Sequence, residues 1–377
     1  MYDLILKFVH TRPLIDFAVS PIDLVRIGFV GLGSRGIAAI TRYTHIEGAR
    51  IAAICDIDNE AVAKIANQID YTKGVSQYSG EDSWKKICEN PSLDLIYICT
   101  DWLSHAEIAC YAMECGKHVA VEVPAVTSVE EARKLVETAE RTQRHCIMLE
   151  NCIYDIFEDT TYNMVKAGLF GDIYHAEGGY IHNLRYITQW RSVFNQMRKG
   201  DNYPTHGLGP VCRLLDINRT DSLYSIVSTG HPVSGGTHTV SLIRTEKGKS
   251  ITLQHNIHAS RPYSRLYLFN GDKGYASKYP QPHISLSSDE YLSQTEFSAL
   301  MEEYKPSYTD AVRSIMPEGT EERRYMDYAM DYRLIYCLRN GLPLDMNVYD
   351  AATWSCVSEL SHLSIEDGSI PVLFPEL

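Results

Sequence analysis

Nearly continuous apolar segments alternate with amphipathic ones over the first 150 residues. The apolar runs are LVRIGFVG, ARIAAICD, LDLIYICT and HVAVEV, which begin at residues 24, 49, 93 and 118. Helices are expected between them, at 37–43, 60–69 and 106–115, and a further one over EARKLVETAE, where Ser128 and Glu131 have the spacing of a capping box. Short apolar strands that alternate with helices are typical of a parallel sheet covered on both faces. The pattern therefore predicts an α/β domain of the doubly wound Rossmann type at 24–151, preceded by an N-terminal arm at 1–23.

The hydrophobic period changes after residue 151. Polar and apolar residues alternate with period two in IYHAEGGYIHNL, SLYSIVSTG, HTVSLIRTE, SITLQHNIH and SRLYLFN. Strands of this kind, separated by short turns, indicate a mainly antiparallel sheet. The last stretch is helical again, at 321–340 and 348–368. We expect an α+β domain at 152–377, with a large, mainly antiparallel sheet.

Composition and charge narrow the class of protein. The 377 residues carry 48 Asp plus Glu against 35 Lys plus Arg, a formal net charge of -13. This balance argues against a nucleic-acid partner, whose phosphates require a basic surface. No apolar run reaches the roughly 18 residues of a membrane span. The ten cysteines form no C-x-x-C pair, so we expect a reducing, cytoplasmic location, or a periplasmic one if a signal segment is missing from the sequence.

A glycine-rich turn follows the first strand. Gly31, Gly33 and Gly36 stand between that strand and the first helix, and Asp56 closes the second strand 20 residues later. Such glycines allow a tight turn and a close approach to a pyrophosphate, while the acid accepts hydrogen bonds from a ribose diol. The motif predicts a dinucleotide cofactor, and Asp56 favours NAD over NADP. Arg35 is the one residue here that could favour NADP.

Longer motifs resemble a known family. RIGFVGLGSRG, DWLSHAEIACYAMECGKHVAVEVP and MVKAGLFGDI are similar to the Gfo/Idh/MocA oxidoreductases. That family usually has Glu-Lys-Pro at the positions of Glu122-Val123-Pro124, where the lysine polarises the reacting hydroxyl; this chain has Val123. The family also flanks a catalytic histidine with acids, whereas the segment NYPTHGLG at 202–209 keeps His206 without them.

A narrower resemblance follows from VEVPA, LENCIY, GGYIHNLR, YPTHGLGPV and MDYRLIYCLRNGLPLD, which look like glycoside hydrolase family 109, the NAD-dependent alpha-N-acetylgalactosaminidases. The resemblance implies NAD contacts from Ser34, Arg35, Asp56, Trp102, Leu103, Ser104, His105, Glu122, Val123 and Asn151, beside the glycines. It implies a sugar site formed by Tyr180, Arg191, Tyr203, Pro204, Thr205, His206 and Tyr263. It also implies a homo-oligomer formed through the C-terminal sheet.

Strand geometry adds one residue to the predicted sugar site. His182 is two residues from Tyr180, so both side chains lie on one face of a strand. Gly178 lies on that same face, and we expect its missing side chain to leave room for a ligand ring.

The implied chemistry is hydrolysis by transient oxidation at C3 of the sugar, elimination across C1 and C2, addition of water and re-reduction. His206 is the predicted acid or base, and Tyr180 the predicted proton shuttle. The histidines show no metal-ligand spacing, so no metal is expected. One alternative is an NAD-dependent sugar dehydrogenase, which the absence of a lysine at position 123 disfavours. A second is an inactive sugar- or NAD-binding protein, suggested by the unusual segment at 318–325.

Overall fold

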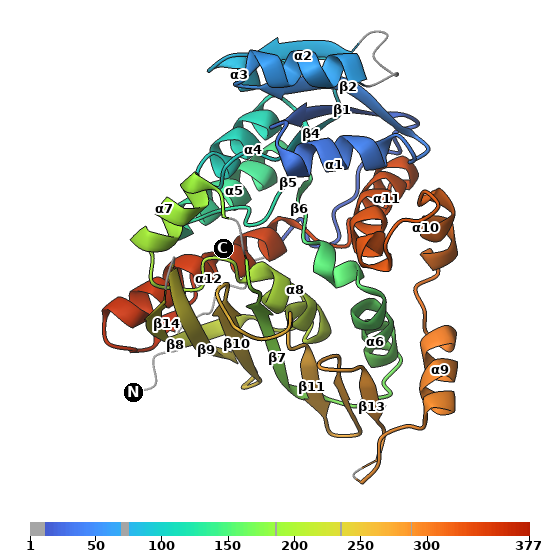
Figure 1. The fold of residues 1–377 in the computed structure, drawn as a ribbon, viewed down its shortest axis with the longest axis vertical. Helices are drawn as coiled ribbons and strands as arrows, with labels where there is room; N and C mark the ends of the chain where they lie inside the picture. Colours follow the sequence, from blue (N-terminus) through green and yellow to red (C-terminus); the bar gives the residue numbers. More distant parts are fainter. Residues whose placement is uncertain (1–11, 69–74, 185–186, 234–235, 288) are drawn as a thin grey trace, which may run out of the picture.

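The computed structural model describes residues 12–68, 75–184, 187–233, 236–287 and 289–377, and it contains two sheets with their covering helices (Figure 1). The first sheet has the strand order β3-β2-β1-β4-β5-β6, and every neighbouring pair is parallel. Its strands are β1 (Val25–Val30), β2 (Ala49–Asp56), β3 (Ser76–Ser79), β4 (Leu95–Ile98), β5 (His118–Val121) and β6 (Cys146–Met148). This order is the one expected of a dinucleotide-binding Rossmann sheet.

Helices connect these strands and bury them. They are α1 (Ser34–Tyr43), α2 (Asn59–Gln68), α3 (Ser83–Cys88), α4 (His105–Glu114) and α5 (Val129–Thr142). Every residue of β4 and β5 is buried, which explains why their sequences are apolar rather than alternating. The predicted doubly wound domain is confirmed.

The second sheet has the order β13-β12-β11-β7-β10-β9-β8-β14. Its neighbours are antiparallel except for β7 and β10, which run parallel. The predicted mainly antiparallel sheet is therefore confirmed. Its strands are β7 (Ile173–Ile181), β8 (Leu223–Val233), β9 (Gly236–Thr245), β10 (Ser250–Asn256), β11 (Leu268–Gly271), β12 (Tyr275–Ser277), β13 (His283–Ser285) and β14 (Val372–Leu373).

The remaining helices lie around and between the two sheets (Figure 1). They are η1 (Asn151–Tyr154), α6 (Ile156–Lys166), α7 (Gln189–Met197), α8 (Thr205–Leu214), α9 (Gln294–Glu303), α10 (Thr309–Ile315), η2 (Glu322–Arg324), α11 (Tyr325–Asn340) and α12 (Val348–Glu366). Helix α12 connects the two sheets: it contacts α5 and β6 of the Rossmann domain and β8 of the second sheet.

The described part of the N-terminal segment packs on the last two helices. Leu14 is buried, and its backbone N–H donates to the hydroxyl of Tyr349 in α12 over 3.4 Å. The N–H of Ile22 donates to the carbonyl of Leu338 in α11 over 3.1 Å.

Among the described residues, no helix is both long and apolar enough to cross a bilayer.

The helix after the YPTH segment begins earlier than the position of Pro210 suggests. Proline favours the first turn of a helix, but α8 starts at Thr205 and Pro210 lies inside it. Pro204 occupies the N-cap with φ of -73°, and the N–H of Leu208 donates to its carbonyl over 2.9 Å. The fixed φ of proline favours a helix start, so Pro204 fills that role. His206 therefore lies in the first turn of α8.

Candidate active site

The glycine turn between β1 and α1 is shaped to accept a pyrophosphate. Gly31 has a φ of +93°, and a Cβ there would lie 2.5 Å from the carbonyl oxygen of Cys99. A Cβ on Gly36 would lie 2.0 Å from the carbonyl oxygen of Gly31, whereas the Cβ position of Gly33 faces open space. Helix α1 begins without a side-chain cap or an acidic residue in its first turn, so its N–H groups can bind an anion.

Asp56 stands at the end of β2, beside this turn. Its Oδ2 accepts a hydrogen bond from the N–H of Leu32 over 2.6 Å, and its Oδ1 accepts one from Asp58 over 3.0 Å. A carboxylate has about four lone-pair sites, so it can still accept from a ribose diol. The hydrogen bond from Leu32 holds the Asp56 carboxylate beside the glycine turn. Asp56 and the three glycines therefore fit the ribose and the pyrophosphate of a dinucleotide.

Arg35 is committed to acids on other elements. Its Nε donates to Oε1 of Glu122 over 2.8 Å, and its Nη1 lies 3.7 Å from Oδ1 of Asp327 in α11. The charge of Glu122 raises the pKa of this guanidinium and outweighs the opposite effect of burial, and Asp327 raises it further. Asn151 donates to the same Oδ1 of Asp327 over 2.7 Å. Arg35, Glu122 and Asn151, predicted separately as cofactor residues, therefore form one network with Asp327.

The turn after β4 contributes Trp102, Leu103, Ser104 and His105. The indole of Trp102 is buried, while Leu103 is exposed. The hydroxyl of Ser104 bonds Oγ1 of Thr100 over 2.8 Å. His105 is buried, with Nδ1 2.8 Å from the carbonyl of Pro124 and Nε2 3.2 Å from that of Thr100. Both ring nitrogens of His105 are thus occupied by backbone, so its ring anchors the turn.

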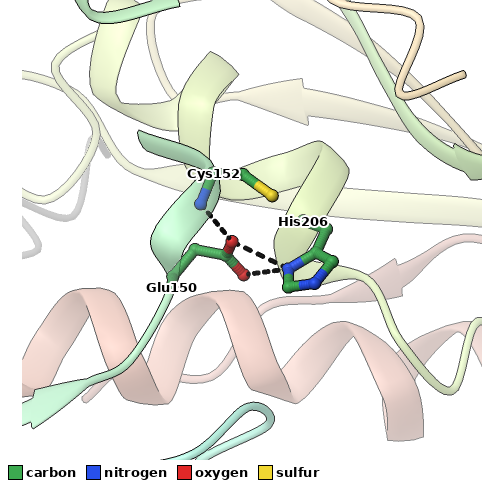
Figure 2. Close-up of side chains that lie close together, drawn as sticks. All are labelled: Glu150, Cys152 and His206. Carbon is green, nitrogen blue, oxygen red and sulfur yellow. Dashed lines mark hydrogen bonds and ion pairs between the residues drawn. The ribbon is translucent and has the colours of Figure 1, made fainter. Parts of the chain in front are cut away.

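Glu150, which is fully buried, and His206, which is largely buried, form a close pair (Figure 2). The Nδ1 of His206 lies 2.8 Å from each carboxylate oxygen of Glu150, and Oε1 also accepts from the N–H of Cys152 over 3.0 Å. Burial alone would raise the pKa of Glu150, but His206 outweighs it and holds that pKa below its ordinary value. The ionised carboxylate accepts the Nδ1 proton, which leaves Nε2 as the basic nitrogen.

Tyr180 on β7 contacts this pair and carries a partner of its own. Its ring centroid lies 5.4 Å from that of His206, and its hydroxyl is 3.0 Å from Nδ1 of His182. Burial lowers the pKa of His182, aided by Arg191, and burial raises the pKa of Tyr180. A neutral imidazole can accept the proton of a protonated phenol, so the two side chains form a proton-transfer path.

Close backbone contact brings α8 onto β7. A Cβ on Gly178 would lie 2.2 Å from the carbonyl oxygen of Gly207, and a Cβ on Gly207 would lie 2.2 Å from the nitrogen of Gly179. The expectation that Gly178 leaves room for a ligand ring is therefore wrong, because the backbone of α8 fills that space. These glycines instead let His206 reach Tyr180.

The predicted sugar residues gather around Tyr180 and His206. Tyr203 lies 5.0 Å from Tyr180 and 4.7 Å from His206, measured between ring centroids. Tyr263 lies 6.2 Å from Tyr180. Pro204 and Thr205 begin α8. The structure thus brings together residues that are more than 80 positions apart in the sequence, from Tyr180 to Tyr263.

Arg191 lies between this cluster and Trp102, which belongs to the turn after β4. That turn stands at the carboxyl edge of the first sheet, where the cofactor is predicted to bind, and this edge is called the cofactor edge. The guanidinium of Arg191 lies 4.5 Å from the ring centroid of Tyr203 and 4.9 Å from that of Trp102. Trp102 and Tyr203 themselves stack, with centroids 5.7 Å apart. The Nε and Nη2 atoms of Arg191 are buried and have no hydrogen-bond partner. Buried donors left unpaired are costly, and a polar ligand would satisfy them.

The acid–base pair and a neighbouring cysteine also form a group of potential metal ligands. Among the described residues, Glu150, Cys152 and His206 offer ligand atoms that all lie within 4.8 Å of one another. Both carboxylate oxygens and Nδ1 of His206 are already paired with each other, and burial raises the pKa of the Cys152 thiol, so the thiolate ligand is disfavoured. The geometry favours an acid–base pair.

Sequence reasoning missed two acids of this site. It interpreted His206 as lacking acidic partners, but Glu150 provides one from the end of β6. An acid directly after the buried run CIML, at the carboxyl end of a strand, was an available signal. Asp327 gave no such signal, because it lies inside a helix whose sequence looks like ordinary core.

Family comparisons cover nearly the whole chain. A model described as "Oxidoreductase family, NAD-binding Rossmann fold" matches residues 25–150, and one described as "Glycosyl hydrolase 109, C-terminal domain" matches 158–240 and 231–377. "Glycosyl hydrolase family 109 protein 1" of Bacteroides fragilis is 45% identical, over 97% of this chain and 88% of its own length. "Alpha-N-acetylgalactosaminidase" of the same species is also 45% identical, over 96% of this chain and 94% of that protein.

Solved structures share the fold. A levoglucosan dehydrogenase in complex with NADH and L-sorbose has a TM-score of 0.74 at 16% identity, covering 94% of this chain and 100% of that one. Myo-inositol dehydrogenase from Lactobacillus casei, in complex with NAD(H) and myo-inositol, has a TM-score of 0.69 at 18% identity, covering 94% and 98%. At these identities the likeness concerns the fold alone.

Proposed function

Because this chain belongs to glycoside hydrolase family 109, within the Gfo/Idh/MocA group with its NAD-binding Rossmann fold, we propose that it is an NAD-dependent glycosidase acting on alpha-N-acetylgalactosaminides. The observation that carries the proposal is the contact between the Glu150–His206 pair and Tyr180. These side chains lie in the ring cluster that reaches the cofactor edge through Tyr203 and Trp102.

The chain's own residues supply the acid and the base of the reaction. Bound NAD would supply the hydride acceptor for oxidation at C3 of the sugar and the hydride for its reversal, while Tyr180 would pass the proton of the C3 hydroxyl to His182. The C3 ketone acidifies the C2 proton, and Nε2 of His206 removes that proton. The C2–H electron pair becomes the C1–C2 double bond, and the C1–O pair leaves with the glycosidic oxygen. That oxygen takes a proton from Tyr180, and His182 helps to restore the tyrosine.

Addition of water completes the reaction. Its hydroxyl adds to C1 and its proton passes through Tyr180 to His182, while His206 returns a proton to C2. The C3 oxygen regains a proton when C3 regains its hydride, so the net change is hydrolysis without net oxidation. The mechanism requires no pair of carboxylates at the anomeric carbon. Glu150 acts on His206 rather than on the sugar, because both of its oxygens face the imidazole.

The alternative is a sugar dehydrogenase, which the fold also accommodates. A dehydrogenase of this group usually has a lysine at the position of Val123, and Val123 is buried here. The test incubates the protein with aryl alpha-N-acetylgalactosaminides, with and without NAD, and follows phenol and NADH together. The glycosidase releases phenol without accumulating NADH. NADH that rises in step with sugar consumed would establish the dehydrogenase, and neither product would indicate the inactive binding protein.

NAD rather than NADP is the proposed cofactor, and Asp56 is its proposed determinant. The 2'-phosphate of NADP would meet the Asp56 carboxylate, while Arg35 is paired with Glu122. Replacing Asp56 with alanine should weaken NAD binding by about 1.5–3 kcal/mol, the value of a charge-assisted hydrogen bond. Titration of NAD into the apoprotein measures this loss. Asp58→Ala is the matched control, and equal affinities in the two variants would remove Asp56 from the site.

The outward face of the second sheet is the proposed oligomer interface of the 152–377 domain. Leu242 on β9 and Tyr224 on β8 are 56% and 37% exposed, and the guanidinium of Arg244 lies 5.1 Å from the Tyr224 ring centroid. A second copy would cover these apolar groups. Sedimentation should show an oligomer that Leu242→Asp dissociates; a wild type that sediments as a monomer would contradict the proposal.

A further inference from the structure

Helix α7 presents an apolar stripe to solvent beside the candidate active site. Trp190, Val193 and Met197 are 40%, 49% and 72% exposed and follow one another at helical spacing. The helix is anchored at the edge of this stripe, because Phe194, one turn after Trp190, is buried with its ring edge-on to Trp102, 5.3 Å between centroids. The exposed stripe is therefore fixed in place relative to the cofactor edge.

Trp190 is the member of this stripe that reaches the active site. Its ring is edge-on to that of Trp102, with centroids 5.2 Å apart and an interplanar angle of 76°. Trp102 in turn stacks on Tyr203, which contacts His206. Trp190 therefore lies two ring contacts from Tyr203 and is the half-exposed end of a continuous series of rings.

Trp190 is placed to contact the leaving group, which is the part of the substrate attached to the glycosidic oxygen. The sugar that reacts must lie beside His206 and Tyr180, and Arg191, which lies over the Tyr203 ring, has two buried donors that it could pair with. Its leaving group must then extend away from these residues toward solvent, and the half-exposed Trp190 is the solvent end of the series of rings that begins there. An exposed indole offers a flat apolar surface, and covering it with another ring releases water from both.

We propose that Trp190 is the wall of a leaving-group subsite, where it stacks on a ring attached to the glycosidic oxygen. The inference rests on the proposed glycosidase function and adds a specificity to it. The ligand presents a flat apolar face, which is either an aromatic ring or the C–H face of a second sugar. Smaller leaving groups, such as methanol, do not reach it.

The experiment compares three alpha-N-acetylgalactosaminides: an aryl glycoside, a disaccharide and the methyl glycoside. Trp190→Ala should lower kcat/KM about 3- to 10-fold for the aryl glycoside, mainly through KM, because a lost aromatic contact has this magnitude. The methyl glycoside should change less than twofold. A matching loss for the disaccharide assigns the subsite to sugars as well as aryl groups. Trp190→Phe should keep most of the aryl preference.

Val193→Ala is the matched control, because it removes an exposed apolar side chain from the same stripe and should leave the three kcat/KM values unchanged. Equal losses of Trp190→Ala on all three glycosides, or no loss on the aryl glycoside, would overturn the subsite while leaving the proposed function intact. A change in sedimentation of Trp190→Ala without an aryl-specific loss would instead assign the stripe to a second copy of the chain. A wild type that hydrolyses none of the three would overturn the proposed function itself.

Discussion

Replacing His206 with alanine should lower glycosidase turnover by about 100- to 10,000-fold, the range found when an acid–base group is removed. The structure gives the reason: Glu150 holds Nδ1 of His206, so Nε2 is the basic nitrogen next to Tyr180. NAD affinity should stay nearly unchanged, because the glycine turn lies on β1 and α1. Single-turnover kinetics measure the first effect and NAD titration the second. Near-normal turnover would remove His206 from the chemistry.

The same variant should also change how stability depends on pH. In the wild type, His206 holds the pKa of Glu150 below its ordinary value. Such a group contributes stability above its unfolded pKa, and the contribution disappears as pH falls through the folded pKa. Without His206, the main group that opposes the effect of burial is gone and the N–H of Cys152 remains, so the pKa of Glu150 should rise above its wild-type value and ionisation then contributes less stability. The decrease in Tm of His206→Ala relative to wild type should therefore be larger at pH 8 than at pH 5, as measured by thermal unfolding at both pH values.

Replacing Glu150 with glutamine should lower turnover by about 100- to 1,000-fold, although Glu150 does not contact the sugar in this account. A neutral amide can donate to Nδ1 of His206 and favour the tautomer that carries its proton on Nε2, which is unable to act as the base. KM should change little, because the ring cluster around Tyr203 is retained. The split between kcat and KM distinguishes this positioning role from a general loss of structure, which would affect both.

Cys152→Ser is the matched control for Glu150→Gln. Its backbone N–H still donates to Glu150, and the thiol is not part of the acid–base pair, so turnover should stay within a factor of about two to three of wild type. If instead Glu150, Cys152 and His206 held a catalytic metal, this variant would be as damaging as Glu150→Gln, and activity would be lost on dialysis against a chelator.

The Rossmann half of the fold could be predicted because its signals are local. Each buried strand such as LDLIYICT is apolar throughout, and Gly31, Gly33 and Gly36 fix the turn that follows β1. Helix α5 begins as its sequence indicates, with Ser128 accepting a hydrogen bond from the N–H of Glu131. In the second half, the alternating strands were visible, but α7, α9 and α10 were not expected, because each is short, at 9, 10 and 7 residues.

The candidate site was only partly predictable, because its key contacts join distant segments. Tyr180, Tyr203 and His206 carried recognisable motifs. The position of Glu150 at a strand end was a local signal for a site acid, but its pairing with His206 crosses 56 positions in the sequence and could not be read from either segment. Gly178 was assigned to the ligand because its strand face could be predicted, whereas the approach of α8 to that face could not. Whether a glycine makes room for a ligand or for backbone depends on tertiary packing.

Hydrolysis in deuterated water tests the central claim most directly. If His206 removes the C2 proton after oxidation at C3, the sugar released from an aryl alpha-N-acetylgalactosaminide should carry deuterium at C2, as read by proton NMR or mass spectrometry. The exchange should require NAD and should be lost in His206→Ala. Active wild-type protein that releases the sugar with its original C2 hydrogen would contradict the account, because direct displacement at C1 leaves C2 untouched.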